Sequence, residues 1–301
     1  MTRERYVLFY LCQYDKTTIL FTFGVTMKKF TTLVAIDFSK SSYVVLEKAL
    51  DFTNKRDGEL HVVHVVESSF FSKKEDIDAV HERRYTELSK NYSEIKKENF
   101  HCVSGKIKVE VANSAKLLDA DLIIMGNSGE THFLNEFIMG SHTKEIIKNA
   151  QTPILVMKDE HELEYKNILV LTDLSDDSAA AIKKVANFFP NSKITLLNLF
   201  YLPSDDKFGL FGFEEDDLEK YQARIKDESQ KNIDAFLKSL SMPNELDISA
   251  SAIVSSLNPK KFKEEASDIS YDMLSIHATQ NVSFFAFDIL EQSDVDVFVV
   301  K

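Results

Sequence analysis

Cysteine is scarce in this sequence. Only Cys12 and Cys102 occur among its 301 residues, and neither belongs to a Cys-x-x-Cys pair or to a Cys/His spacing. Two cysteines are too few for a disulfide framework, and the spacings offer no zinc site of the usual kind. We therefore expect the chain to work in a reducing compartment, the cytoplasm.

Positive charge is also in deficit. Lysine and arginine total 36 against 48 aspartates and glutamates, which gives a net charge of −12. General electrostatic attraction does not draw such a chain to nucleic acid or to an anionic membrane, so neither partner is expected. A nucleotide ligand would have to be held by local geometry.

No apolar run is long enough to span a bilayer. The strongest N-terminal candidate, residues 6–11, is soon interrupted by Asp15 and Lys16, and no convincing small-residue cleavage pattern follows. A well-formed strand pattern opens at Met27. We interpret residues 1–26 as an extension outside the folded unit, and a start codon chosen too far upstream would account for it.

What the sequence does contain is one strand-and-helix pattern that occurs twice. Residues 31–39 read Thr-Thr-Leu-Val-Ala-Ile-Asp-Phe-Ser, and residues 167–175, at an offset of 136, read Asn-Ile-Leu-Val-Leu-Thr-Asp-Leu-Ser. Phe188 falls on Phe52 at the same offset. A period of this length indicates two copies of one domain. The length, with 44% hydrophobic and 28% charged residues, also suits two soluble α/β domains.

The repeat defines the predicted domains. We expect a first domain over residues 27–158, a short linker over residues 159–165, and a second domain over residues 166–301. Buried strands alternate with amphipathic helices, which favours a parallel sheet covered on both faces. The elements expected in the first half are strands over 31–37, 60–66, 100–104, 121–125 and 152–158, and helices over 39–55, 73–98, 106–118 and from Gly140 onward.

One of these segments allows two interpretations. Residues 106–111 alternate in polarity like a strand, yet the apolar residues as far as Leu118 also lie at helical spacing. The helix is preferred because it follows a strand over 100–104 and keeps the rhythm that the strand at 121–125 requires.

The residues after that strand carry the chemistry. Asp121-Leu-Ile-Ile-Met-Gly-Asn-Ser-Gly129 places two glycines just beyond a buried strand, and Gly140-Ser-His-Thr143 opens a helix. Glycines let the backbone approach a bulky anion, and N–H groups before the helix, with Ser141, offer donors to it. The pattern predicts a phosphate-binding loop that does not strictly need a metal or a basic side chain. Taken singly, paired glycines after a strand more often form a plain turn, and Gly-Ser before a helix is more often a plain cap, so it is their joint placement that favours a ligand site.

The second half lacks this loop. Ile276-His-Ala-Thr-Gln280 stands where the first half has Met125-Gly-Asn-Ser-Gly129, so a β-carbon and a side chain replace bare backbone. A second pocket should therefore be closed or altered. Asp173 and Ser175 retain the strand-end pattern and are interpreted as structural.

On these residues the chain resembles the universal stress protein family in its tandem two-domain form. The resemblance covers residues 27–301 and rests on the strand ending in Asp37-Phe-Ser39, the strand over 120–126, the glycine loop, and Gly140-Ser141 before residues 152–156. It implies two open five-stranded parallel sheets of order 3-2-1-4-5, each doubly wound with helices on both faces. Ligands of such sheets bind at the switch point over the carboxyl ends of the strands.

The chain departs from the family signature at one place. In members that bind ATP the signature is Gly, two residues, Gly, nine residues, then Gly-Ser or Gly-Thr. Here ten residues separate Gly129 from Gly140. The extra residue is either absorbed as a bulge in the loop or displaces the phosphate donors.

The resemblance also implies roles position by position. Asp37 would face the adenosine end of a nucleotide, with Ala35 beneath it, and Val65 would offer its backbone to the base. Asp37 could instead be a helix-capping or solvated acid, and His142 a surface residue of the first helical turn. The implied nucleotide-binding residues are Ala35, Asp37, Val65, Met125, Gly126, Gly129, Gly140, Ser141 and His142.

The function implied is that of a cytoplasmic stress-response protein that binds ATP, with AMP or ADP as alternatives and Mg²⁺ as an accompanying ion, and that forms homodimers. The sequence has no GxxxxGK[ST] motif, and the loop has no arginine, so any ATPase activity should be slow and regulatory. No catalytic or metal-binding residue is predicted.

Two other hypotheses compete with this one. If the extra loop residue disables the pocket, the chain is a scaffold that acts by dimerisation and protein interaction. Family habit then makes residues 154–157 and 297–300 the seam between the two halves. An enzyme of the related nucleotide-activating α/β class would need a Ser-Gly-Gly loop after the first strand, which residues 38–41 do not supply.

Overall fold

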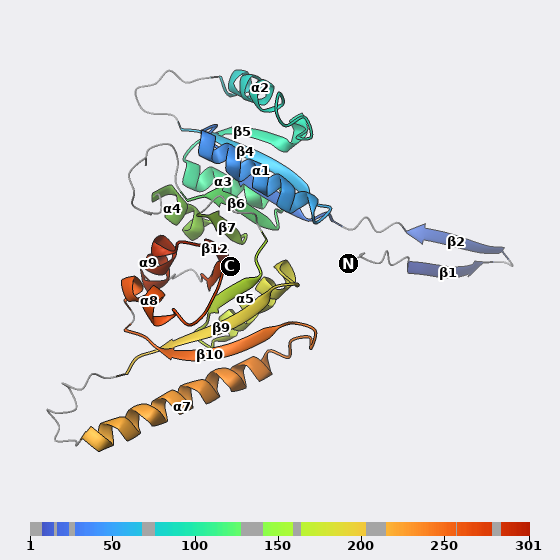
Figure 1. Ribbon diagram of the computed structural model, residues 1–301. Coiled ribbons are helices and arrows are strands. Elements are labelled where there is room, and N and C mark those ends of the chain that lie inside the picture. The colour runs from blue at the N-terminus through green and yellow to red at the C-terminus, as the bar shows by residue number, and fades with distance from the viewer. Residues whose placement is uncertain are drawn as a thin grey trace.

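The computed structural model describes residues 8–14, 17–23, 28–67, 76–127, 141–158, 164–202, 215–256, 258–278 and 284–301. Among them, ten strands form one sheet in the order β10-β9-β8-β11-β12-β7-β6-β3-β4-β5, and helices lie on both of its faces (Figure 1). Near the N-terminus, β1 (Leu8–Tyr14) and β2 (Thr17–Phe23) pair as an antiparallel hairpin in a sheet of their own. The sequence analysis predicted no strands in that segment.

The two halves of the large sheet are built from similar elements. The first half contains β3 (Thr31–Ala35), α1 (Lys40–Asn54), β4 (Glu59–Val66), α2 (Ile77–Leu88), a 3-10 turn (Lys97–Asn99), β5 (Phe100–Ser104), α3 (Ile107–Leu117), β6 (Leu122–Gly126), α4 (Ser141–Asn149) and β7 (Ile154–Met157). The second half contains β8 (Asn167–Leu171), α5 (Asp176–Phe188), β9 (Lys193–Phe200), α7 (Glu215–Ser239), β10 (Ile248–Val254), α8 (Pro259–Glu265), β11 (Met273–His277), α9 (Phe284–Gln292) and β12 (Asp296–Val300).

Each half has the same strand order. β5-β4-β3-β6-β7 and β10-β9-β8-β11-β12 are both the order 3-2-1-4-5, and the strands within each half pair in parallel. This confirms the predicted doubly wound α/β fold. It also resolves the ambiguous segment, because residues 107–117 form helix α3 as preferred.

The repeat extends to the turn that follows the first strand of each half. Ser39 caps α1 by accepting a hydrogen bond from the N–H of Ser42, and Ser175 caps α5 by accepting one from the N–H of Ser178. The corresponding residues of the two hydrogen bonds are 136 positions apart, which is the offset found in the sequence. Serine at this position satisfies a helix N–H that would otherwise lack a partner, which is worth about 1 kcal/mol.

The halves join where β7 pairs antiparallel with β12. The register sets Ile154 opposite Val299, Leu155 opposite Phe298 and Val156 opposite Val297, as the seam hypothesis predicted. Because this single pairing is antiparallel, the strands of the two halves run in opposite directions. The carboxyl ends of the strands in the first half therefore point in the opposite direction from those in the second half.

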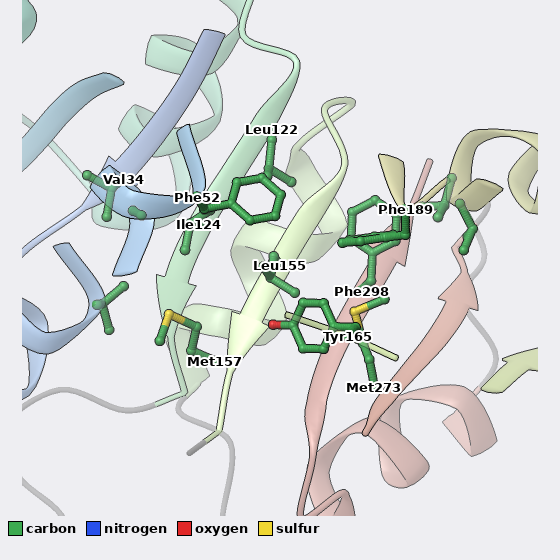
Figure 2. Packing of buried hydrophobic residues seen from close by; sticks show 14 of the residues in the cluster. Val34, Phe52, Leu122, Ile124, Leu155, Met157, Tyr165, Phe189, Met273 and Phe298 are labelled. Atoms are coloured by element: carbon green, nitrogen blue, oxygen red, sulfur yellow. The ribbon is translucent and has the colours of Figure 1, made fainter. Parts of the chain in front are cut away.

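Hydrophobic packing continues across the seam. In the described residues, one buried cluster lies on the side of α1, α5 and α7, and another lies on the side of α3, α4, α8 and α9. In the first cluster the rings of Phe52 and Phe189 are 6.4 Å apart, and the Phe298 ring is 5.3 Å from that of Phe189 (Figure 2). Tyr165, placed in the predicted linker, is itself 9% exposed and packs 5.5 Å from Phe189. The halves thus share their cores.

The long helix predicted over residues 73–98 is wrong in length, since α2 ends at Leu88. The chain turns there, and Tyr92 and Ile95 become 8% and 2% exposed. The Tyr92 hydroxyl donates to Glu47 on α1, at 2.8 Å. Burial of these two side chains outweighs the weak helix preference of the charged residues around them.

Within the described ranges, no helix combines the length and the apolar composition that crossing a bilayer requires.

Candidate functional site

The candidate site lies at the switch point of the first half. β3 leads into α1 on one face of the sheet, and the neighbouring β6 precedes α4, which packs on the other face. Helices that diverge in this way leave a crevice over the carboxyl ends of the strands. β3 pairs in parallel with both β4 and β6, so the residues at the carboxyl ends of these three strands lie close together. The predicted site residues brought together there are Ala35, Asp37, Val65, Met125 and Gly126.

Asp37 is an exposed carboxylate at the start of α1. Its Oδ1 accepts a hydrogen bond from the N–H of Ser39, at 2.9 Å. Burial of part of the side chain opposes ionisation, but hydrogen bonds from Ser39 and Ser42 outweigh it and lower the pKa of Asp37 below its ordinary value. The group is therefore charged at neutral pH. It stabilises the turn before α1, whose capping residue is Ser39, and its side chain stays exposed near the carboxyl end of β3.

Phe38 shapes this turn at a cost. Its φ is 65°, in the left-handed region, which costs a non-glycine residue roughly 1–2 kcal/mol. Its ring packs 4.9 Å from that of His64, and the Arg84 guanidinium lies 4.5 Å over it. Leu174, at the equivalent place in the second half, has a φ of 63°. The strain therefore belongs to the repeated turn and not to a ligand site alone.

Gly126 is constrained by packing. A β-carbon there would lie 3.3 Å from Cγ2 of Val45 on α1, which is tighter than ordinary contact. Met125 is 6% exposed within the core, and Ala35 and Val65 are partly buried against the same cluster. These residues can present backbone atoms to a ligand but little side-chain surface.

Asn127 was missed by the sequence analysis. It directly follows Gly126, its N–H donates to Met157 O at 3.0 Å, and its own carbonyl accepts from the Thr143 hydroxyl at 3.3 Å. Its side-chain Oδ1 is buried and has no hydrogen-bond partner in the described structure. Buried acceptors are almost always paired, so this one needs an explanation. A polar residue next to the strand-end glycine was the signal that could have found it.

The predicted phosphate residues are only partly described. Gly129 and Gly140 lie outside the described residues. Ser141 and His142 form the first turn of α4, so the expected helix start after Gly140 is found. Free N–H groups at such a start favour an anion.

The second half has different chemistry at the matching edge. His277 stands at the position of Gly126, because β11 pairs with β8 as β6 pairs with β3. Its Nε2 lies 3.7 Å from Oδ2 of Asp173, the equivalent of Asp37, and its side chain is 19% exposed. Burial opposes ionisation of Asp173, yet hydrogen bonds from Ser175 and the nearby imidazole of His277 lower its pKa. An imidazole thus occupies space that is bare backbone in the first half.

In the part of the chain that the structure describes, no three histidine, cysteine, aspartate or glutamate side chains gather closely enough to hold a metal ion.

Known proteins resemble this chain in sequence and in fold. The model of the universal stress protein family matches residues 30–158. A putative universal stress protein of Staphylococcus saprophyticus is 30% identical over 156 residues, which is 47% of this chain and 90% of the relative. A universal stress protein of Methanocaldococcus jannaschii is 26% identical over 151 residues, 42% of this chain and 93% of the relative.

A solved structure matches over both halves. The crystal structure of a universal stress protein from Archaeoglobus fulgidus has a TM-score of 0.56 over 90% of this chain and 96% of its own, at 16% identity. That likeness extends the fold to the second half, which the family model does not reach. The chain belongs to the universal stress protein family.

Proposed function

We propose that this chain is a regulatory protein of the cytoplasm that binds an adenine nucleotide, ATP, in its first half. Residues 27–158 and 166–301 would be two universal stress domains joined by residues 159–165. The repeated strand order and the shared turn chemistry support this division.

The nucleotide would lie in the crevice between the β3–α1 turn and the start of α4. Asp37 faces the adenosine, Val65 offers backbone to the base, and Met125 and Gly126 line the ribose and phosphate edge. The phosphates are held by Gly129, Gly140, Ser141 and His142, with Mg²⁺ as an accompanying ion. AMP and ADP would make the same contacts, except those to the phosphate groups that they lack.

The observation that carries this proposal is the unpaired acceptor of Asn127. Its buried Oδ1 lies beside Gly126 at the switch point, where the fold places ligands. A buried acceptor without a hydrogen bond destabilises the folded protein by roughly 1–3 kcal/mol. A ribose hydroxyl or an adenine amino group carries the donor that would satisfy it, so the residues present fit a nucleoside.

The second half is proposed to be degenerate. His277 fills the place of Gly126 and lies against Asp173, so a nucleotide would have to displace both. The chain would then hold one nucleotide and no catalytic machinery, and any hydrolysis would be slow. We expect a homodimer to use a surface other than the last strands, because β7 and β12 pair with each other.

Mass spectrometry of the purified, denatured protein tests the proposal. We expect an adenine nucleotide to be released at about one equivalent or less. The variant Gly129→Val should fold as the wild type does, judged by circular dichroism, and release none, because a side chain would block the phosphate approach.

The scaffold hypothesis keeps one specific support, the ten-residue spacing before Gly140. It predicts no retained nucleotide, and neither heat nor a thermal shift when ATP is added at millimolar concentration. That combination of results would replace the nucleotide proposal with the scaffold.

A further inference from the structure

Two histidines face each other far from the nucleotide crevice. Nδ1 of His61 on β4 and Nε2 of His101 on β5 are 3.0 Å apart, and the two rings are nearly parallel, with centroids 5.3 Å apart. His101 pairs in register with Val63, and His61 precedes Val63 by two residues, so both imidazoles lie on one face of the sheet. They sit near the amino ends of their strands, whereas the crevice lies over the carboxyl ends.

Both imidazoles are half-buried and available as neutral ligands. Burial lowers the pKa of His61 and of His101, and neutral imidazole is the form that binds metal ions. The Glu59 carboxylate is close enough to His61 to act against that shift, so the site carries a nearby negative charge. A cation gains from that charge.

We propose that His61 and His101 form a two-imidazole site for a divalent first-row transition-metal ion. Nitrogens at 2.0–2.1 Å from one ion lie roughly 2.8–3.0 Å apart when their bonds are at right angles and about 3.3–3.4 Å apart in a tetrahedron. The observed 3.0 Å lies at the upper end of the right-angle range. Small ring rotations would turn both lone pairs toward a common point.

The binding step requires a change of tautomer in one ring. The hydrogen bond between the rings contains one proton, which moves to the other nitrogen of the donating ring when both facing nitrogens bind the ion, so both imidazoles stay neutral and no net proton is released. No third protein ligand gathers there among the described residues, so water completes the coordination. The order of affinity should follow the usual series for nitrogen ligands, with Cu²⁺ above Ni²⁺ and Zn²⁺.

The chain offers matched controls for this site. Nδ1 of His64 lies 3.0 Å from the carbonyl oxygen of Ile36, and Nε2 of His81 lies 2.9 Å from that of Phe100. Each of these rings contacts a backbone carbonyl and does not face a second imidazole nitrogen. His81→Gln should therefore leave metal binding unchanged.

Calorimetric titration with Ni²⁺ or Zn²⁺, without nucleotide and in a buffer that does not chelate, tests the inference. We expect one ion per wild-type chain, binding weakened roughly tenfold or more in His61→Gln and in His101→Gln, and no change in His81→Gln. Nuclear magnetic resonance of the wild type provides a test that needs no variant, since Zn²⁺ should shift the ring nitrogens of His61 and His101 but not those of His64 and His81. No binding by the wild type, or full binding by both variants, would overturn the inference.

Discussion

At the scale of single residues, Asn127 connects stability to ligand binding. Its Oδ1 is buried without a partner in the described structure. The residue before it is Gly126, where an added β-carbon would lie 3.3 Å from Cγ2 of Val45. An unpaired buried acceptor lowers the stability of the ligand-free protein, whereas a hydrogen bond from a ligand to the same atom would increase the affinity for that ligand. Stability and affinity should therefore respond to its removal with opposite signs.

We predict that Asn127→Leu raises the free energy of unfolding of the nucleotide-free protein by roughly 1 kcal/mol and weakens ATP binding. Urea denaturation without nucleotide gives the first value, and calorimetric titration with ATP gives the second. Thr143→Val, which removes the hydroxyl that donates to the Asn127 carbonyl, serves as a control for disturbance of the backbone. Equal ATP affinity of Asn127→Leu and wild type would show that Oδ1 does not contact the ligand.

Sequence reasoning reached some of these residues and not others. Asp37 and Ser39 could be found because each ends a buried strand or begins a helix, and because both recur at Asp173 and Ser175. The position of Asn127 after the strand-end glycine was a signal, but its unpaired acceptor was not, since that depends on what the neighbouring strand and helix leave without a partner. The strained φ of Phe38 likewise follows from the three-dimensional turn.

At the scale of secondary-structure elements, strand β4 brings buried histidines into the sheet. Burial lowers the pKa of His61 and His64 on β4 and of His101 on β5 below the ordinary 6.5. The folded state thus favours the neutral rings. The unfolded chain takes up protons first as the pH falls, which pulls the equilibrium toward unfolding.

The free energy of unfolding should therefore have its full histidine contribution above about pH 6.5 and lose it progressively below that value. Denaturant titrations between about pH 7.5 and about pH 5.5, with a chelator present, measure this. His101→Gln should reduce the slope, because one of the three groups no longer titrates. A stability that is flat or that increases as the pH falls through this range would be contrary to the burial of these rings.

The elements also show where sequence periodicity succeeds and where it fails. Strong patterns such as β3, β6 and α1 were predicted to within two or three residues, since one buried face fixes their period. Helix α2 was predicted too long, because charged, helix-favouring residues continue beyond Leu88 and gave no hint that the chain turns there and buries Tyr92 and Ile95. Tertiary packing decided where that helix stops.

At the scale of the whole molecule, the two halves form one sheet with shared cores. The offset of 136 could be predicted from the sequence, and the pairing of the last strands from the family resemblance. The sharing of aromatic side chains between halves could not, because it depends on the contact of Phe52, Phe189 and Phe298 across the seam. Such packing couples the unfolding of one half to that of the other.

We predict a single cooperative unfolding transition for the residues of the large sheet, observed alike by far-ultraviolet circular dichroism and tyrosine fluorescence. Phe298 is fully buried at the seam, so Phe298→Ala should lower the free energy of unfolding by roughly 3–5 kcal/mol. Two separate transitions in the wild-type protein would indicate that the halves unfold independently.

We propose that one half of this repeated molecule binds nucleotide and that the other does not. Asp37 and Asp173 form the same hydrogen bond in the same turn, so they provide a matched pair of substitutions. Calorimetric titration of ATP into wild type, Asp37→Asn and Asp173→Asn should give one site per chain, weakened roughly tenfold or more by Asp37→Asn and unchanged by Asp173→Asn. No binding to the wild type, or an equal loss in both variants, would contradict the claim.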